Sequence, residues 1–367
     1  MLRLWAMVRK EFVHIRRDPR SLAMAFLMPL ILLVLFGYAI TMDITNLNLV
    51  VVDHDRSSAS RNYLERFSAS GYFTVVAQSD DEEEARRLLD GGQAHIALII
   101  PRHFARDLAS GREVPVQALS DGSDANTASI GQGYLEGVTG RFNADYLELI
   151  ATPLLENRLR VWYNPELKSR WFIIPGLIAV IMTVITALLT SLTVSREWES
   201  GTMEQLISTP VQPLELMLGK MTPYFLIGMF DMLLAVALAV WVFGVPLHGS
   251  LLFLVGVTAL FLLGGLGLGI FISTVARSQL VASQAAMVST FIPAFLLSGF
   301  LYAIENMPAP LQVITHLVQA RYFVAVLKAI FLKASPPAYL LEELAFLALF
   351  AAVVMVVAVR KFEKKIR

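Results

Sequence analysis

Six long apolar runs constrain this chain more than any other feature of its sequence. They cover residues 22–41, 172–194, 222–244, 251–274, 281–302 and 338–359. A helix rises about 1.5 Å per residue, so about twenty apolar residues match the roughly 30 Å hydrocarbon core of a membrane. Hydrophobic residues make up 56% of the chain and charged residues 16%, whereas soluble domains have about 45–50% and about 25%. The sequence therefore predicts an α-helical polytopic membrane protein with six transmembrane helices.

The charges at the two ends of the chain predict its orientation. Arginine and lysine are frequent in residues 3–20, before the first apolar run, and again in residues 360–367, after the last. Cytoplasmic segments carry such an excess of positive charge, so we expect both termini in the cytoplasm, which requires an even number of spans. The first run is too long for a cleavable signal peptide and lacks a cleavage site, which predicts a retained transmembrane helix at 21–42.

Residues 1–20 have apolar side chains at near-helical spacing, with arginine and lysine between them. This pattern predicts a cytoplasmic amphipathic helix that lies in the membrane surface and is broken by Asp18-Pro19. The alternative is a basic stop signal that only sets the topology.

Residues 43–170, between the first and second apolar runs, have the composition of a soluble domain. Expected strands at 47–52, 72–76, 95–100 and 114–119 alternate with expected helices at 58–68, 81–89 and 104–110. Such alternation predicts an inserted α/β domain. A long helix over about 127–160 is expected to lead back to the membrane. Because the first span starts in the cytoplasm, we expect this domain to lie outside the cytoplasmic membrane.

The segment 195–221 carries dense charge directly after the second apolar run. It begins Arg196-Glu197-Trp198-Glu199-Ser200-Gly201-Thr202-Met203-Glu204 and continues to Thr209-Pro210. Each ionised side chain in hydrocarbon costs roughly 2.5–3.5 kcal/mol or more, so the segment must lie at the membrane face, as a short polar helix. Six spans place it in the cytoplasm. A structured, charged element there indicates contact with a soluble partner.

The sequence lacks the motifs of catalytic chemistry. It has no Gly-x-x-x-x-Gly-Lys-Ser/Thr phosphate-binding loop, no Gly-x-Ser-x-Gly elbow and no cysteine. Its histidines are scattered, and the acids at 80–84 fit the first turn of a helix better than a metal site. We therefore expect no catalytic residue, metal or cofactor in this chain. Its formal net charge of zero gives no indication of nucleic-acid binding.

Three features inside the expected spans suggest roles in structure or transport. Asp231 is the one acid deep in a span; such carboxylates act as proton relays or counter-ions, or form interhelical hydrogen bonds. With no basic partner in another span, a structural role is favoured. The glycine-rich stretch 264–269 favours close helix packing, with a gating hinge as the alternative. Candidates to line an apolar path are Phe26, Met28, Phe291 and Phe295.

The charged segment resembles the cytoplasmic signature of type-2 ABC exporter permeases, which lies between their second and third spans. The resemblance rests on Glu197-x-Glu199-x-Gly201-Thr202-x-Glu204, followed by Leu206 and Thr209-Pro210. The stretch from Ser298-Gly299-Phe300 through Met307-Pro308 and Gln312 to Ala320-Arg321-Tyr322-Phe323 is similar to the extracytoplasmic re-entrant region of that family. The segments 162–166 and 52–57 resemble a bacterial subgroup that has a large periplasmic domain and is associated with drug or lipid efflux. The resemblance covers essentially the whole chain.

This resemblance implies the permease subunit of an ATP-driven exporter in the bacterial inner membrane, surrounded by lipid. Two such chains, identical or related, would form the pathway, and separate ATPase subunits would bind ATP and magnesium. Residues 171–367 would form a five-helix transmembrane region. The implied ATPase-coupling residues, within 195–221, are Arg196, Glu197, Glu199, Gly201, Thr202, Glu204, Thr209 and Pro210. The implied residues of the outer gate and the re-entrant segment 303–337 are Ser298, Gly299, Phe300, Met307, Pro308, Arg321 and Tyr322.

Two positions depart from the pattern of this subgroup. Ala303 and Gln319 stand where proline is common. The loss of two fixed φ angles is expected to loosen the re-entrant backbone or to change its path.

Two other classes of function share part of this pattern. A membrane-anchored periplasmic binding or scaffold protein would have the same topology, but it gives no reason for the charged cytoplasmic element. An ion-coupled secondary transporter would have several ionisable residues in its spans and an internal repeat, and this sequence has one such acid and no repeat. The sequence leaves open the substrate, homodimer or heterodimer, and whether a periplasmic adaptor is bound.

Overall fold

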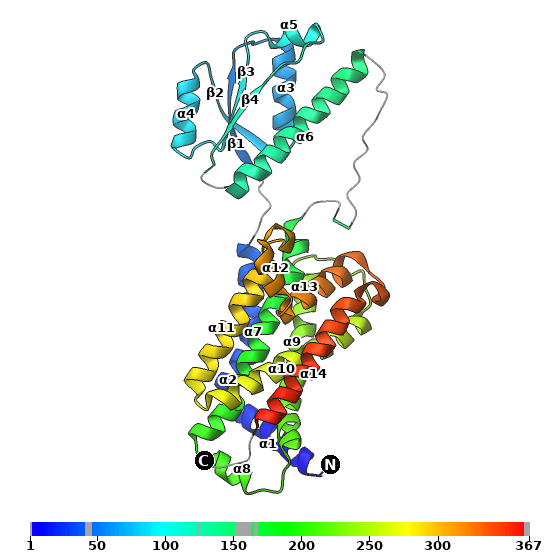
Figure 1. Ribbon diagram of the computed structural model, residues 1–367. Coiled ribbons are helices and arrows are strands. Elements are labelled where there is room, and N and C mark those ends of the chain that lie inside the picture. The colour runs from blue at the N-terminus through cyan, green and yellow to red at the C-terminus, as the bar shows by residue number, and fades with distance from the viewer. Residues whose placement is uncertain (1, 41–45, 123–124, 151–162, 165–167, 363–367) are drawn as a thin grey trace. The chain divides into compact units, whose positions relative to one another are not determined.

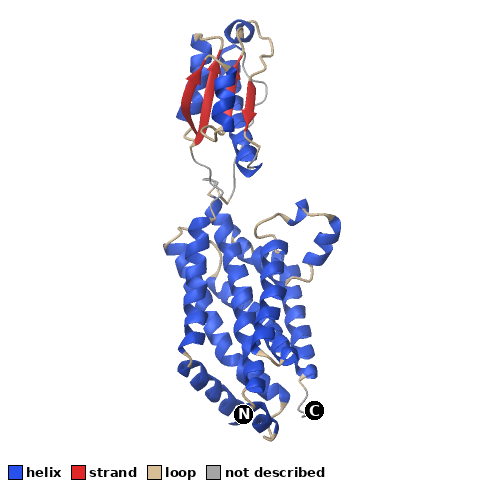
Figure 2. Cartoon of the chain, turned by 90° about the vertical axis from the view of Figure 1, so that its left-hand side faces the viewer, coloured by secondary structure: helices blue, strands red, loops and turns tan. Residues whose placement is uncertain are grey.

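A computed structural model describes residues 2–40, 46–122, 125–150, 163–164 and 168–362 of the chain. The chain divides into two compact units, one made of Met1–Thr41 with Val161–Arg367 and the other of Met42–Arg160. The first unit is helical, and the second contains a sheet (Figures 1 and 2).

The helical unit contains the long apolar helices. Five helical stretches are long and apolar enough to cross a membrane: α7 (Ser169–Glu199), α9 (Pro213–Trp241), α10 (Leu251–Ala276), α11 (Gln279–Leu297) and the stretch Pro337–Lys361, which combines the short η3 (Pro337–Leu340) with α14 (Leu341–Lys361). The first expected span coincides with α2 (Pro19–Ala39), whose apolar part, Ala25–Ala39, is shorter. The described residues thus support a polytopic membrane protein, and the count of six spans stays a prediction.

Shorter elements complete this unit. Helix α1 (Leu2–Arg17) precedes α2, and Asp18 separates the two helices, as expected from Asp18-Pro19. Helix α8 (Thr202–Ile207) follows α7. After α11 come η1 (Ile304–Asn306), α12 (Ala309–Thr315), α13 (Gln319–Lys328) and the π-helical turn η2 (Ala329–Lys333).

Helix α7 forms the centre of the helical unit, since it packs against α2, α9, α10, α11 and α13. Glycines of α10 allow α7 and α10 to pack closely together. A Cβ atom on Gly269 would lie 2.0 Å from Thr190 Oγ1 and 2.5 Å from the Ala187 carbonyl oxygen. The Thr190 hydroxyl in turn donates a hydrogen bond to the Leu266 carbonyl oxygen of α10 at 3.1 Å. The prediction that the stretch 264–269 serves packing is therefore confirmed.

The second unit is built on a four-stranded sheet with the order β2-β1-β3-β4. Strand β1 (Leu47–Asp53) is parallel to β2 (Phe73–Ser79) and to β3 (Ile96–Ile100), whereas β4 (Gln117–Ser120) is antiparallel to β3. The helices of this unit are α3 (Ser58–Ala69), α4 (Glu82–Asp90), α5 (Phe104–Ala109) and α6 (Ala125–Ile150). The helix expected over 127–160 is α6 as far as Ile150, and its remainder lies outside the described residues.

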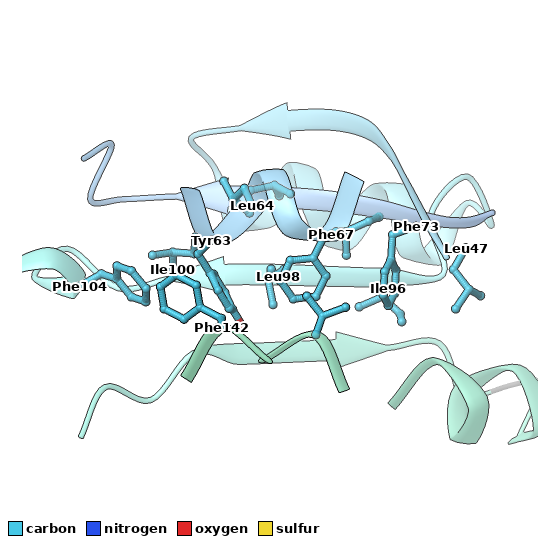
Figure 3. Packing of buried hydrophobic residues seen from close by; sticks show 13 residues of the cluster. Leu47, Tyr63, Leu64, Phe67, Phe73, Ile96, Leu98, Ile100, Phe104 and Phe142 are labelled. Atoms are coloured by element: carbon cyan, nitrogen blue, oxygen red, sulfur yellow. The ribbon is translucent and has the colours of Figure 1, made fainter. Parts of the chain in front are cut away.

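The two faces of this sheet pack against different helices. Side chains alternate along a strand, so Leu49 and Val51 of β1 point to one face while Val50 and Val52 point to the other. On the first face an aromatic core joins α3, α5 and α6, with Tyr63, Phe104 and Phe142 in contact (Figure 3). On the second face the sheet packs against Ala85, Leu88 and Leu89 of α4.

A substitution in α10 tests the close packing of α7 and α10. The variant Gly269→Ala places a methyl group against backbone and hydroxyl atoms of α7, so the helices must move apart, which destabilises the protein by about 1–3 kcal/mol. Thermal unfolding of the purified protein in detergent measures this loss. The control is Gly256→Ala on the same helix, where a Cβ atom meets nothing within 4 Å. Equal melting temperatures for the two variants would contradict this packing.

Candidate functional site

The charged segment after α7 forms a sharp turn between two helices. Helix α7 continues through Arg196, Glu197 and Glu199, and the Ser200 and Gly201 amides still donate to the carbonyls of Arg196 and Trp198. Gly201 has a φ of 68°, a left-handed conformation that favours glycine. Helix α8 then starts at Thr202. The expected short polar helix is therefore corrected in its bounds, because the first three coupling candidates belong to the last turn of α7.

Beneath this turn lies a buried group of charges that we call the inner ion cluster: Glu11 of α1, Glu197 of α7 and Lys220 of α9. The Lys220 ammonium lies 3.0 Å from Glu197 Oε1 and 3.5 Å from Glu11 Oε2, and it also donates to the Thr193 carbonyl at 3.3 Å. Lys220 is 1% exposed, Glu11 3% and Glu197 8%. Three helices thus meet at one lysine, and α1 is far from the other two in the sequence.

Two further residues donate hydrogen bonds to these acids. Lys10 of α1, whose side chain is 45% exposed, donates to Glu197 Oε1 at 2.9 Å. The Tyr224 hydroxyl donates to Glu11 Oε1 at 3.4 Å. Buried charges are tolerated when they are paired in this way, and removal of one partner typically costs about 3–5 kcal/mol. The cluster therefore holds α1, α7 and α9 in one arrangement.

Helix α8 is tied to this cluster through its first residue. The Thr202 hydroxyl lies 3.4 Å from the Glu197 carbonyl oxygen and 3.3 Å from Glu197 Oε2, so it can donate to either oxygen. Met203 and Leu206 are buried on the inner side of α8, whereas Glu204 is exposed. After α8, the Thr209 hydroxyl donates to the Leu206 carbonyl at 2.6 Å, and the Pro210 carbonyl accepts from Arg3 of α1 at 2.9 Å.

The remaining charged residues of the turn contact other helices. Glu199 accepts hydrogen bonds from the backbone amide of Gln279 at 2.8 Å and from its side-chain amide at 2.6 Å. A carboxylate here favours the N-terminus of α11, where free amides and the helix dipole are positive. Arg196 donates to Asp18 at 3.2 Å and to His14 at 2.7 Å, which ties α7 to α1 and to the residue before α2.

The structure thus divides the predicted coupling residues into two groups. Glu197, Glu199 and Arg196 face partners inside this chain, while Glu204 is exposed on α8. Sequence reasoning missed Lys10, Glu11, Lys220 and Tyr224. One signal was present: Glu11 lies on the otherwise apolar face of α1, between the buried Val8 and Ile15. An acid on such a face requires a buried cation.

The predicted outer residues also gather, at the other end of the helical unit (Figure 1). Gly299 has a φ of 75° and turns the chain after α11, which lets Phe300 pack so closely on α7 that a Cβ atom on Gly176 would lie 2.6 Å from its ring. Ser298 is buried at this turn. Pro308 precedes α12, and the Met307 carbonyl accepts from the Gln312 side chain at 2.9 Å.

Helices α12 and α13 complete this outer region. The α12 stretch and the stretch Gln319–Lys333 are bent by 83° at a short break, which is the geometry of a broken span or a re-entrant loop. Arg321 donates to the Thr315 hydroxyl, and Tyr322 stacks on Phe346 of α14 with 4.3 Å between ring centroids. The re-entrant role itself stays a prediction.

The two positions expected to loosen this region, Ala303 and Gln319, have defined conformations in the structure. Ala303 has a φ of −62°, which is close to the value that proline would impose. Gln319 is buried and donates to the Phe261 carbonyl of α10 at 2.7 Å. Gly264 makes room for this amide, because a Cβ atom there would lie 2.7 Å from Gln319 Nε2. A side-chain hydrogen bond thus anchors the start of α13 where the subgroup commonly has a proline.

Asp231 and the apolar path candidates lie elsewhere in the unit. Asp231 is buried in α9, and its Oδ1 atom has no hydrogen-bond partner within the described part of the chain. An apolar cavity of about 310 Å³ lies between α2, α7 and α11, and Met28, Phe291 and Phe295 line it. Phe26 does not; it packs edge-on against Phe230 with ring centroids 5.6 Å apart.

Comparison with known proteins decides the family. A family model described as "ABC-2 family transporter protein" matches residues 19–360. The chain belongs to the ABC-2 family. It is 39% identical to the "Probable multidrug ABC transporter permease YbhS" of Escherichia coli (strain K12), over 100% of this chain and 97% of that protein. It is 33% identical to YbhR of the same strain, named in the same way, over 90% of each chain.

The resemblance seen in the sequence is therefore confirmed. A third relative, the "Inner membrane transport permease YhhJ" of Escherichia coli (strain K12), is 32% identical over 77% of this chain and 76% of its own length. This ABC-2 protein is a transporter permease, and its long apolar helices agree with a multi-pass membrane protein.

A pair of substitutions tests the inner ion cluster of this ABC-2 permease. The variant Lys220→Met leaves Glu11 and Glu197 buried without their shared cation, and we expect it to lose about 3–5 kcal/mol of stability. The variant Lys10→Met removes an exposed partner of the same Glu197 and should cost about 0–1 kcal/mol. Thermal unfolding in detergent measures both. The triple variant E11Q/E197Q/K220M should recover much of the loss, and no recovery would argue against charge as its cause.

Proposed function

We propose that this chain is the permease subunit of an ATP-driven exporter in the bacterial inner membrane. In this proposal two permease chains form the transmembrane pathway, and separate ATPase subunits bind to α8 from the cytoplasm. The exported compounds are hydrophobic or amphipathic, such as drugs or lipids. The single observation that carries the proposal is a short exposed helix tied to a buried ion cluster that joins three helices.

The contacts of α8 suggest how force passes into the membrane region. Glu204 is exposed on α8 and would contact the ATPase. Met203 and Leu206, which are buried, hold the helix against the rest of the unit. A displacement of α8 would be transmitted to Glu197 through the Thr202 hydroxyl. From Glu197 it would pass to Lys220 of α9 and then to Glu11 of α1. Glu197 then acts by transmission rather than by direct contact with the ATPase. Because the cluster is buried, the three helices would move as one body.

The apolar cavity supports a pathway for apolar cargo. The described residues that line the cavity, from α2, α7 and α11, are all apolar. Large apolar side chains are also exposed along α2 and α11, among them Met28, Ile31, Met287 and Val288. We assign these faces to the second permease chain and to lipid. The relatives named multidrug permeases fit a cavity that binds by shape and not by specific polar contacts.

The remaining parts take the following positions in this proposal. Both termini and α8 lie in the cytoplasm, and the α/β unit lies in the periplasm. Phe300, the turn at Ser298-Gly299 and the bent pair α12–α13 form the outer gate, near the exit. The close packing of Phe300 on Gly176 supports a gate that closes directly on α7.

A charge reversal tests the ATPase contact. The variant Glu204→Lys should lower substrate-stimulated ATP hydrolysis of the reconstituted complex at least about tenfold, as expected when a rate-relevant contact of about 1.4 kcal/mol is lost. The control is Glu83→Lys, an acid of the α/β unit whose side chain is 72% exposed. Wild-type coupling in the Glu204→Lys complex would refute the assignment of α8 as the docking element.

The absence of cysteine allows a direct test of orientation. The single-cysteine variant Ser208→Cys, at the end of α8, should react with a membrane-impermeant maleimide only in inside-out vesicles. The variant Ser110→Cys, at the end of α5, should react only in intact spheroplasts, since the α/β unit is placed outside. Labelling of position 208 from outside would overturn the proposed topology and the ATPase contact with it.

A further inference from the structure

A second cavity lies at the end of the helical unit opposite α8. It has a volume of about 850 Å³ and lies between α13, the turn after α11 and the first turn of α14. Volumes of about 300–1,000 Å³ are typical of small-molecule sites. Arg321, Ala325 and Lys328 of α13 all line this cavity, which follows from their i, i+4, i+7 spacing on one helix face.

Lys328 is a half-buried cation without a carboxylate partner. Its ammonium donates to the Gly299 carbonyl at 2.9 Å and lies 3.5 Å from the centre of the Phe172 ring. Among the described residues, no carboxylate oxygen lies within 4 Å of it. A carbonyl and an aromatic face stabilise a cation without neutralising it. An anionic group in the cavity would supply the missing charge.

Arg321 provides a second cation two helical turns away. Its guanidinium donates to the Thr315 hydroxyl and to the Gln312 carbonyl at 3.5 Å, and again no described carboxylate lies within 4 Å. A guanidinium has five N–H donors, so it can bind a further acceptor. Arginine and lysine together are the usual ligands of phosphate groups.

The acids of the cavity restrict the ligand further. Glu305, Glu342 and Glu343 also line it, and none of them forms an ion pair with Arg321 or Lys328. A compact dianion would meet three carboxylates beside two cations. A ligand that carries both an anionic and a cationic group fits this mixture better, because each of its charges finds an opposite partner.

Apolar surface on the same segment indicates that the ligand has an apolar part. Phe172 and Phe346 line the cavity, and Val313, Ile314 and Leu317, in and just after α12, are exposed. We infer that this cavity binds the headgroup of a zwitterionic phospholipid. Arg321 and Lys328 bind its phosphate diester, and Glu342 and Glu343 bind its amine. This lipid site goes beyond the proposed function, since it requires neither the ATPase nor a transported cargo.

Intact-mass measurement of protein–lipid complexes tests the site on the full-length purified chain without an ATPase. Four probes are titrated: phosphatidylethanolamine, phosphatidylglycerol, diacylglycerol and inorganic phosphate. We expect phosphatidylethanolamine to bind most tightly, because only it offers both charges and an apolar part. Binding of inorganic phosphate as tight as that of the phospholipid would replace the lipid site with a small-anion site. Equal binding of diacylglycerol would overturn any role of the charges.

Matched variants assign the contacts. Lys328→Gln should raise the apparent Kd for phosphatidylethanolamine about tenfold, as expected for a lost charged hydrogen bond, and Lys328→Arg should retain binding. Lys333→Gln, five residues further on at an exposed position, is the control and should leave the Kd unchanged. Glu343→Gln should weaken phosphatidylethanolamine binding but strengthen phosphatidylglycerol binding, a gain that misfolding cannot produce.

Two outcomes separate this inference from the proposed function. If Lys328→Gln binds lipid as Lys333→Gln does, the headgroup site is wrong, while export and ATPase coupling are untouched by that result. If the lipid site is found but the reconstituted complex shows no ATP-driven export, the proposed function fails and the lipid site stands.

Discussion

The arrangement of α1, α7 and α9 depends on the ion pairs that the Lys220 ammonium forms with the carboxylates of Glu11 and Glu197. A lysine that is 1% exposed is stable only while its carboxylate partners stay in place. Each of these partners lies on a different helix, so none of the three helices can shift alone without leaving a charge unpaired. In the proposed function, the cluster would therefore pass a change at α8 to α1, α7 and α9 together. Hydrophobic contacts alone would permit sliding, because they are not directional.

Helix α7 extends this constraint along the whole helical unit. It has 31 residues, about 46 Å at 1.5 Å per residue, and most of its length is buried. Near one end lies Glu197 in the inner ion cluster, and near the other lies Gly176 against Phe300. Between them, Gly265 and Gly269 of α10 fit closely around Thr186 and Thr190. The helix is thus fixed by polar contacts at one end, by small residues in the middle and by an aromatic ring at the other.

Local patterns in the sequence predicted much of this architecture. The strand expected at 47–52 is β1 (Leu47–Asp53), and the run 251–274 is α10 (Leu251–Ala276), because alternation and apolar length are properties of single segments. The turn at Gly201 was visible as a glycine, but the continuation of α7 to Glu199 was not, since charge near a span suggests an ending. The partners of Glu197 could not be predicted, because Glu11 and Lys220 lie 186 and 23 residues away in sequence and meet only through the packing of α1 on α9. The role of Gln319 was missed for the same reason: its partner is the Phe261 carbonyl of another helix.

The two ends of the helical unit use buried charge in opposite ways. At the α8 end each buried cation has its carboxylates, so the charges are satisfied within the chain and serve rigidity. At the α13 end, within the described residues, Arg321 and Lys328 have carbonyls, a hydroxyl and an aromatic ring but no carboxylate within 4 Å, so their charge is available to something outside the chain. A rigid coupling element should keep the same counter-ions at all times. A site that exchanges charged ligands, in contrast, needs cations that are not already paired with carboxylates of the same chain. This difference in charge pairing, rather than the number of charges, distinguishes the α8 end, which we assign to ATPase coupling, from the α13 end, which we assign to lipid binding.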